Sequence, residues 1–397
     1  MWCSLVFRYK YLNYVLVCVI VLYMWLLFIG ISDTRIGNKP VDALQVGMKY
    51  ILRWEDSWHE TGLDALEQGR DAFINNKCEF NNCYVTQNQN YFEDPTKFHA
   101  VVMFGKHLES YRRLPRLRSP KQKFVFATME SAHYYPICRK EFDNYFNWTW
   151  TFRLDSDVKW GYLTVYDAEG RPVGPRGPGG PGGTGATAWR DTYDPLPDRV
   201  RKRLKSKHKA AAWFVSNCRS KNKREVLVEK LNQELQLFNM TVDIYGACSK
   251  DKNNKCERFD DDCYKKLERD YFFYLAFENS FDKDYVTEKV LTAFNNYVVP
   301  IVYGDANYSR FLPPGSYLNA GDYSVKDLVK IMRGIMSDET LYEDFFRWKN
   351  HYRLKLTSYN EDLCKMCALM NDNTKLETIS VYENFRQWWN GKHACKS

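Results

Sequence analysis

The chain has 397 residues and lacks a GxxxxGK[S/T] sequence. Without that P-loop, a bound nucleotide or diphosphate would be held by side chains rather than by a glycine-rich backbone cradle. Zinc-finger and RNA-binding signatures are also absent, and the longest basic run is RKRLKSKHK at residues 201–209. Although the net charge is +8, a single basic run without such a signature argues against nucleic acid as a partner. An anionic small ligand or an acidic surface is a better match.

Residues 11–31 contain no charged side chain, and no other segment is apolar for so long. A helix of these 21 residues would be roughly 31 Å long, which is enough to cross a bilayer. Arg8 and Lys10 precede the stretch and favour a cytoplasmic N-terminus. A cleaved signal peptide usually has a shorter apolar region. We therefore expect a cytoplasmic tail at residues 1–10, a single transmembrane signal anchor, a stem at residues 32–48 and a large luminal part.

The cysteines are typical of an oxidising compartment. Twelve are present, and the ten that follow the anchor are an even number, which suggests disulfides. Cys364 and Cys367 form a CxxC, but the second CxxC of a zinc site is missing, so structural disulfides are the favoured interpretation. Asn-X-Ser/Thr sequons at Asn147, Asn239 and Asn307 predict N-glycosylation in the secretory pathway.

Strand-like and helix-like runs fall into two groups. The first group has strand-like runs at residues 49–54, 99–104 and 123–130. The second has expected strands at residues 210–217, 241–246, 271–278 and 298–303, and expected helices at residues 224–238, 285–296 and 325–353. Strand–helix–strand occurs twice in the second group, which predicts a parallel sheet covered by helices. Between the groups lies GRPVGPRGPGGPGGTGAT at residues 170–187, which is too short for collagen and is expected to be a flexible loop or linker.

In a parallel sheet, ligands bind at the carboxyl ends of the strands. Three polar stretches, at residues 216–224, 245–248 and 278–289, follow strands of the second group. Arg224 and Lys289 fall in the first turns of two expected helices, where a cation opposes the helix dipole. An anion bound between them would remove that conflict, so the pair predicts a diphosphate site. The alternative is that both are solvated surface cations.

Several of these stretches resemble a known family. FYLAFENSFDKDYVTEK at residues 273–289, followed by VVPIVYGDANYSRFLPPGSYLNA at 298–320, resembles the donor-binding signature of the α1,3-fucosyltransferases, glycosyltransferase family 10. Further matches follow the family order: the N-terminal anchor, MESAHYYP with Glu130, NWTWTFRLDSD at 147–157, WFVSN at 213–217 followed by Arg224, VDIYGAC at 242–248, and the CxxC. The glycine-rich insert departs from the family pattern. So does Ala132, where Lewis-type members usually have proline.

The resemblance implies an α/β fold of GT-B architecture, with two Rossmann-like lobes and a cleft between them. The lobes would be an acceptor-side lobe at residues 49–187 and a GDP-fucose-binding lobe at 188–355, followed by a C-terminal segment at 356–397. It also implies an invertebrate-type member in the Golgi membrane with its catalytic part in the lumen. The implied reaction is inverting transfer of L-fucose from GDP-β-L-fucose, in α1,3 linkage, to a GlcNAc of glycoprotein glycans, with no cofactor required.

The family pattern also assigns roles to residues. Glu130 would be the general base, and Cys78 or Cys83 would bridge to Cys364 or Cys367. The residues expected at the donor are Asn217, Arg224, Tyr245, Gly246, Glu278, Asn279, Tyr285, Glu288 and Lys289.

The chemistry is consistent with these roles, and two alternatives remain. Inversion by a single displacement needs one carboxylate to take the acceptor proton, while cations stabilise the departing diphosphate. Asp155 and Asp157 could instead be the DxD motif of a metal-dependent nucleotide-sugar transferase. A third interpretation is an inactive luminal protein that binds nucleotide or glycan. The acceptor, either the core or an antenna of an N-glycan, stays open.

Overall fold

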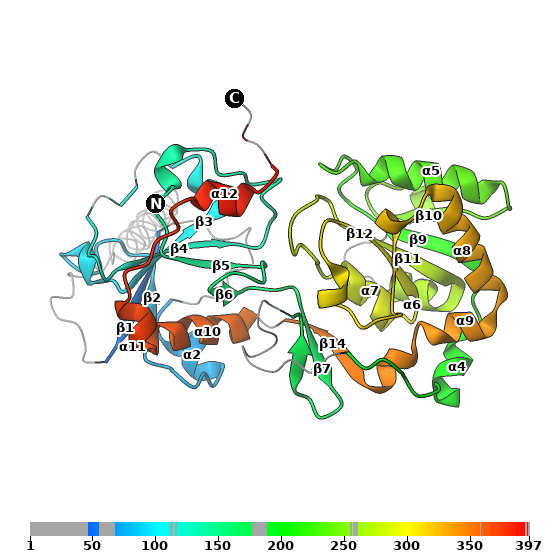
Figure 1. Cartoon of the computed structure of the whole chain (residues 1–397), viewed down its shortest axis with the longest axis horizontal. Helices are drawn as coiled ribbons and strands as arrows, with labels where there is room; N and C mark the ends of the chain where they lie inside the picture. Colours follow the sequence, from blue (N-terminus) through cyan, green and yellow to red (C-terminus); the bar gives the residue numbers. More distant parts are fainter. Residues whose placement is uncertain are drawn as a thin grey trace, which may run out of the picture.

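The structure is a computed structural model in which two lobes lie side by side (Figure 1). It describes residues 47–54, 68–111, 114–115, 117–176, 189–254, 256, 261–357, 359–393 and 395. The expected transmembrane anchor, tail and stem lie outside these residues, apart from the last two residues of the stem. Among the residues described, no helix combines the length and apolar character needed to cross a membrane.

The first lobe is built on a parallel sheet with the strand order β2-β1-β3-β4-β5-β6. Its strands are β1 (Lys49–Arg53), β2 (Cys83–Thr86), β3 (Ala100–Phe104), β4 (Lys123–Thr128), β5 (Trp148–Thr151) and β6 (Val158–Lys159). All residues of β3, β4 and β5 are buried, because side chains from alternate positions enter a separate core on each face of the sheet. Two short helices, α2 (Asp71–Asn75) and α3 (Gly105–Leu108), belong to this lobe.

The second lobe has a parallel sheet with the order β10-β9-β11-β12-β13. Its strands are β9 (Lys209–Phe214), β10 (Val242–Tyr245), β11 (Tyr271–Phe277), β12 (Val299–Tyr303) and β13 (Leu318–Asn319). Its helices are α4 (Asp198–Leu204), α5 (Arg224–Gln236), α6 (Asp261–Asp270), α7 (Lys289–Asn295), α8 (Val325–Ser337) and α9 (Glu339–Asp344). Apolar residues of α5 and α8 share one core with the sheet, and those of α7 enter the other. The prediction of two α/β lobes with parallel sheets is therefore confirmed.

A third, antiparallel sheet has the order β14-β7-β8. Its strands are β7 (Leu163–Asp167), β8 (Pro172–Gly174) and β14 (Tyr352–Leu356). Two sequence predictions are corrected here. The expected loop at 170–187 contains β8, which pairs with β7, whereas residues 177–188 lie outside the described part. The closing helical region ends before residue 353, because Tyr352 and Leu354 alternate with exposed residues and pair with β7.

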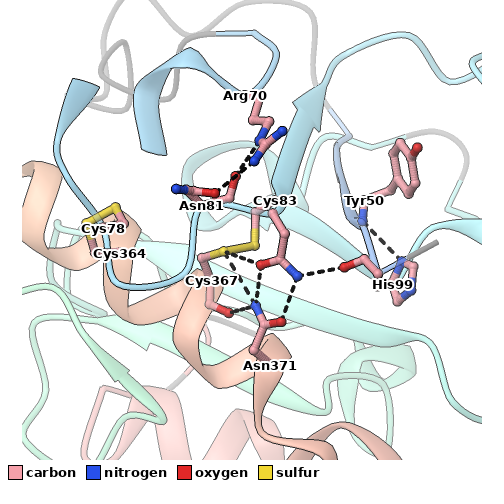
Figure 2. Close-up of a disulfide and its surroundings, with 11 residues drawn as sticks. Tyr50, Arg70, Cys78, Asn81, Cys83, His99, Cys364, Cys367 and Asn371 are labelled. Carbon is pink, nitrogen blue, oxygen red and sulfur yellow. Dashed lines mark hydrogen bonds between the residues drawn. A yellow bond between two sulfur atoms is a disulfide. The ribbon is translucent and has the colours of Figure 1, made fainter. Parts of the chain in front are cut away.

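The C-terminal segment returns to the first lobe. Its helices are α10 (Tyr359–Asn371), α11 (Asn373–Glu377) and α12 (Phe385–Asn390), and Figure 1 shows α10 and α12 beside the first-lobe sheet. The structure pairs Cys78 with Cys364 and Cys83 with Cys367, the pairing between distant parts of the chain that the family resemblance implies (Figure 2). A further disulfide joins Cys138 to Cys395. Asn371, one helical turn after Cys367, hydrogen-bonds to Asn82 and the Cys367 carbonyl.

The three sequons differ in exposure. Asn239 and Asn307 are exposed, which is compatible with glycans. Asn147 is only 5% exposed, and its amide nitrogen donates to the Ser380 carbonyl at 2.6 Å. Its amide oxygen accepts the Phe124 N–H at 2.8 Å. A glycan on Asn147 would break these contacts, so the structure favours Asn239 and Asn307 over Asn147 as glycosylation sites.

Candidate active site

The two lobes meet where a loop of the second lobe reaches the first. Residues 279–288 follow β11 and precede α7, and are called the β11 loop here; residues 129–132 follow β4 and are called the β4 loop. In the β11 loop Asp284 has φ +62°, a left-handed conformation that aspartate adopts more readily than most residues. This turn explains why α7 begins at Lys289, four residues later than the helix start expected at residue 285.

Glu130, the expected general base, lies in the β4 loop and contacts the second lobe. The Tyr285 hydroxyl donates to Glu130 Oε1 at 2.7 Å, and the Ser131 N–H donates to the same oxygen at 3.0 Å. Tyr285 is buried, and its ring packs against Phe152 of the first lobe with centroids 4.9 Å apart. Burial raises the pKa of Tyr285 well above its usual value, and the nearby Tyr162 and Glu130 add to this. The phenol therefore stays protonated and remains a donor to the carboxylate.

Arg224 is a buried cation at the start of α5. It is 4% exposed, and its guanidinium donates from Nη1 to the Phe277 carbonyl at 2.5 Å and from Nη2 to the Asn217 carbonyl at 3.4 Å. Its Nε is buried and has no hydrogen-bond partner in the described part of the chain. Burial lowers the pKa of Arg224, although Glu278 opposes this. Neutral carbonyls satisfy the guanidinium only in part, so an anion would be stabilised next to it.

Lys289, at the start of α7, forms an ion pair with Glu278. Its Nζ lies 2.9 Å from Glu278 Oε2 and 2.7 Å from the Thr287 hydroxyl. Burial raises the pKa of Glu278, and Lys289 opposes that rise. Burial also works against the charge of Lys289, but Glu278 and Glu288 outweigh it and raise the pKa of the lysine. The charge of Arg224 opposes the rise in the pKa of Lys289. Arg224 donates to the Phe277 carbonyl and Lys289 pairs with Glu278, so the two expected cations contact consecutive residues at the end of β11.

The other residues expected at the donor occupy different surroundings. Asn217 donates from Nδ2 to the Tyr134 hydroxyl of the first lobe at 2.9 Å. Asn279 is half-buried and accepts from the Ser280 hydroxyl at 3.2 Å. The Glu288 side chain is 42% exposed, with a carboxylate oxygen 3.9 Å from Lys289 Nζ.

Tyr245 is the last residue of β10, and Gly246 follows it. Gly246 has φ +90°, and a Cβ there would lie 2.8 Å from the Val215 carbonyl oxygen, so this position requires glycine. The Tyr245 ring is buried in the core, where its hydroxyl lies 2.7 Å from that of Tyr271. The Tyr245 side chain therefore belongs to the core, and the expectation that this strand end lies near the nucleotide stays a prediction. Close by, the disulfide Cys218–Cys248 joins the loops that follow β9 and β10.

Family models match both lobes. A model of the fucosyltransferase N-terminal region matches residues 47–163, and a model of the C-terminal region of glycosyltransferase family 10, the fucosyltransferases, matches residues 204–388. The chain belongs to glycosyltransferase family 10. The recognition of an α1,3-fucosyltransferase from its motifs is thereby confirmed at the level of the family.

The similar proteins found for this chain are also named as fucosyltransferases. It is 37% identical to α-(1,3)-fucosyltransferase C of Drosophila melanogaster, over 85% of this chain and 74% of that protein. It is 30% identical to glycoprotein 3-α-L-fucosyltransferase A of Drosophila melanogaster, over 83% of this chain and 59% of that protein. It is also 30% identical to a 4-galactosyl-N-acetylglucosaminide 3-α-L-fucosyltransferase of Gorilla gorilla gorilla, over 75% of this chain and 70% of that protein.

Asp155 and Asp157, the pair that could form a DxD motif, both contact other residues of this fucosyltransferase. Asp155 forms ion pairs with Arg153 at 2.9 Å and with Lys283 at 2.7 Å. Asp157 accepts from the Thr149 N–H at 2.9 Å and from the Tyr382 hydroxyl at 2.9 Å. Both carboxylates therefore have structural partners. Within the described residues, no cluster of three or more histidine, cysteine or acidic side chains is placed to hold a metal ion.

Sequence reasoning missed the contacts that cross between the lobes of the fucosyltransferase. Asp282 accepts from the Ala132 N–H, and Lys392 forms a 2.7 Å ion pair with Asp305. The partners in each pair are far apart in the sequence, so no local pattern relates them. Only the crowding of polar residues in the β11 loop indicated that this segment has a function.

Proposed function

We propose that this fucosyltransferase moves L-fucose from GDP-β-L-fucose, in α1,3 linkage and with inversion, to a GlcNAc of glycoprotein glycans. The observation that carries the proposal is the β11 loop, which connects the two kinds of group the reaction needs. At one end Lys289 lies in reach of the Arg224 charge. Near its middle Tyr285 holds Glu130 of the opposite lobe. A diphosphate on the cations and a sugar at Glu130 would therefore meet across this loop.

On the donor side, Arg224 and Lys289 stabilise the diphosphate. The guanidinium of Arg224 is only partly satisfied by carbonyls, so an anionic oxygen near it would gain a strong charge-assisted hydrogen bond. The ammonium of Lys289 is balanced by Glu278 and is kept protonated by that partner. As the bond from fucose to GDP breaks, negative charge grows on the diphosphate, and the two cations stabilise it. No general acid is needed, because GDP leaves as a stable anion.

On the acceptor side, Glu130 takes the proton of the attacking hydroxyl. Its Oε1 already accepts hydrogen bonds from Tyr285 and from the Ser131 N–H, which fix the orientation of the carboxylate. We assign Oε2 to the acceptor hydroxyl. As the hydroxyl oxygen attacks the anomeric carbon, its proton passes to the carboxylate and GDP departs from the opposite face, which inverts the centre.

The glycoprotein acceptor and the location are inferred from related names and from the anchor. One relative is named for glycoproteins and another for 4-galactosyl-N-acetylglucosaminide, and both names specify a fucosyl group at position 3. Five disulfides in the described chain suit a secretory lumen. Together with the uncharged stretch at residues 11–31, they support a Golgi membrane protein with a luminal catalytic part.

The test separates the base from the cations. The luminal part is assayed with GDP-fucose on core-type and antenna-type N-glycans, and GDP binding is measured by calorimetry. We expect Glu130→Gln to lower transfer by roughly 100-fold or more while the Kd for GDP stays unchanged. Arg224→Ala and Lys289→Ala should instead raise the Kd for GDP by roughly tenfold or more. Near-normal transfer by Glu130→Gln would refute the base assignment, and unchanged GDP binding in both cation variants would refute the donor site.

A further inference from the structure

Three successive residues of the β4 loop contact the β11 loop. Glu130 Oε1 accepts from the Tyr285 hydroxyl at 2.7 Å. The Ser131 hydroxyl accepts from the Ser280 hydroxyl at 2.7 Å. The Ala132 N–H donates to Asp282 Oδ2 at 2.5 Å. The β4 loop is thus held residue by residue against the loop that leads to Lys289.

Among these three contacts, the one to Asp282 uses a buried charge. Asp282 is 4% exposed, and its other oxygen, Oδ1, accepts from the Lys283 N–H at 2.8 Å. Burial raises the pKa of Asp282 to about 6, although the N–H groups of Ala132 and Lys283 oppose the rise. A buried carboxylate is costly unless hydrogen bonds satisfy it, and here both oxygens are satisfied by backbone N–H groups.

We propose that Asp282 is a positioning residue, which anchors the β4 loop through the Ala132 N–H and thereby fixes Glu130 relative to the bound donor. This inference rests on the proposed function of Glu130 as the base. The bond between Asp282 and Ala132 is charge-assisted, so it is stronger than the neutral bond between Ser280 and Ser131. Since Ala132 is two residues from Glu130, a shift of the loop there also moves the base.

The consequence of losing the anchor is a less well placed base rather than a lost donor site. Asp282 contacts neither Arg224 nor Lys289 in the hydrogen bonds and ion pairs found among the described residues. Without Asp282 the β11 loop keeps other contacts to the first lobe, among them the one through Asp284 Oδ2, which accepts from the Leu154 N–H at 3.2 Å. A misplacement of a reacting group by about 1 Å can cost on the order of 100-fold in rate.

Asp282→Ala tests the proposal in the complete luminal part. We expect kcat for transfer to fall roughly tenfold or more, while the Kd for GDP stays within about twofold of wild type. Lys283→Ala is the matched control. It lies next in the same loop and reaches the first lobe through Asp155, but its side chain is exposed and is not bonded to the β4 loop. Transfer by this control should stay within about twofold of wild type.

A double-mutant cycle distinguishes positioning from a general structural role. If Asp282 acts through Glu130, then adding Asp282→Ala to Glu130→Gln should lower the residual transfer by less than about twofold. Asp282→Asn keeps the shape and one acceptor oxygen, and is expected to lose at least about threefold in kcat. If Asp282→Ala does not fold, Asp282→Asn replaces it in the double-mutant cycle with Glu130→Gln.

Three results would overturn the inference. The first is a kcat within about twofold of wild type in a folded Asp282 variant. The second is a loss of GDP binding in step with the loss of transfer, because Asp282 would then support the donor lobe itself. The third is a full additive loss in the Glu130→Gln background. None of these results touches the proposed function, which is tested separately by the transfer activity of wild type and Glu130→Gln and by the GDP binding of the Arg224 and Lys289 variants.

Discussion

Asp362 in α10 shows how burial sets the charge of a single side chain. It is fully buried, and Oδ1 lies 2.7 Å from Lys365 Nζ, while Oδ2 has no hydrogen-bond partner among the residues described. Burial raises its pKa to about 7, although Lys365 opposes the rise. Because the pKa in the folded state exceeds the ordinary value of 3.8, the folded protein binds this proton more tightly than the unfolded chain does. The stability that this proton gives is full below pH 3.8 and is lost as the pH rises through about 7.

At this scale we predict that Asp362→Asn flattens the pH dependence of stability. The amide has the shape of the neutral carboxyl and does not ionise. The free energy of unfolding of the variant, measured relative to wild type, should rise by about 2 kcal/mol from about pH 5.5 to about pH 8. Urea unfolding at both pH values would measure this change. Glu361→Gln is the control, since Glu361 is exposed in the same helical turn and should give no such gain. An equal difference from wild type at both pH values would contradict the prediction.

Single residues also show how far the sequence predicts the site. Arg224 and Lys289 were recognisable because each begins a helix after a strand, and the structure places them there. Tyr245 matched the family pattern at a strand end, but a strand alternates its side chains between two faces, and this ring entered the core. The contact between Asp282 and Ala132 could not be predicted from the sequence, since the two residues are 150 positions apart.

At the scale of elements, strands were predicted better than loops. Apolar runs such as those of β4 and β11 are buried on both faces, and a continuous apolar pattern identifies such strands. The start of α7 was misplaced because the Asp284 turn and the contact of Tyr285 with Glu130 keep the preceding residues out of the helix. These contacts are tertiary, so they override the local helical pattern.

The Cys218–Cys248 disulfide leads to a prediction about two loops. It joins residues 30 apart, so the unfolded chain loses more freedom than with Cys256–Cys263, which joins residues 7 apart. Removing it by Cys218→Ser with Cys248→Ser should cost about 4 kcal/mol of unfolding free energy, against about 2.5 kcal/mol for the corresponding change at Cys256 and Cys263. Removing the Cys218–Cys248 disulfide should also raise the Kd for GDP, because Cys218 lies in the loop that contains Asn217 and leads to Arg224.

Denaturant unfolding and calorimetry with GDP would check both parts, with the Cys256 and Cys263 double variant as the control. That disulfide links no residue assigned to the donor, so its removal should leave GDP binding unchanged. If the two double variants changed the Kd for GDP equally, GDP binding would not depend on the disulfide that joins the loops after β9 and β10.

At the scale of the whole molecule, the return of the C-terminal segment determines which residues form the first lobe. The chain leaves the second lobe through β14, and α10 and α12 then pack on the first sheet (Figure 1). The ring centroids of Phe385 and Trp389 of α12 lie 4.9 and 4.8 Å from the ring centroid of Phe126 in β4. Apolar residues of the segment, such as Phe385 and Trp389, do not by themselves identify the lobe that covers them. Only the family's cysteine pattern indicated the first lobe.

We therefore predict that a core substitution in α12 loosens the first lobe rather than the nearer-in-sequence second lobe. Phe385 is fully buried, so Phe385→Ala should cost about 3–5 kcal/mol, whereas Ile379→Ala, at a side chain that is 72% exposed in the same segment, should cost less than about 0.5 kcal/mol. Amide hydrogen exchange followed by mass spectrometry locates the effect. Peptides from β3, β4 and β5 should exchange faster in Phe385→Ala, while peptides from β9, β11 and β12 should keep their wild-type protection. Equal loss of protection in both lobes would mean that the C-terminal segment stabilises the molecule as one cooperative unit.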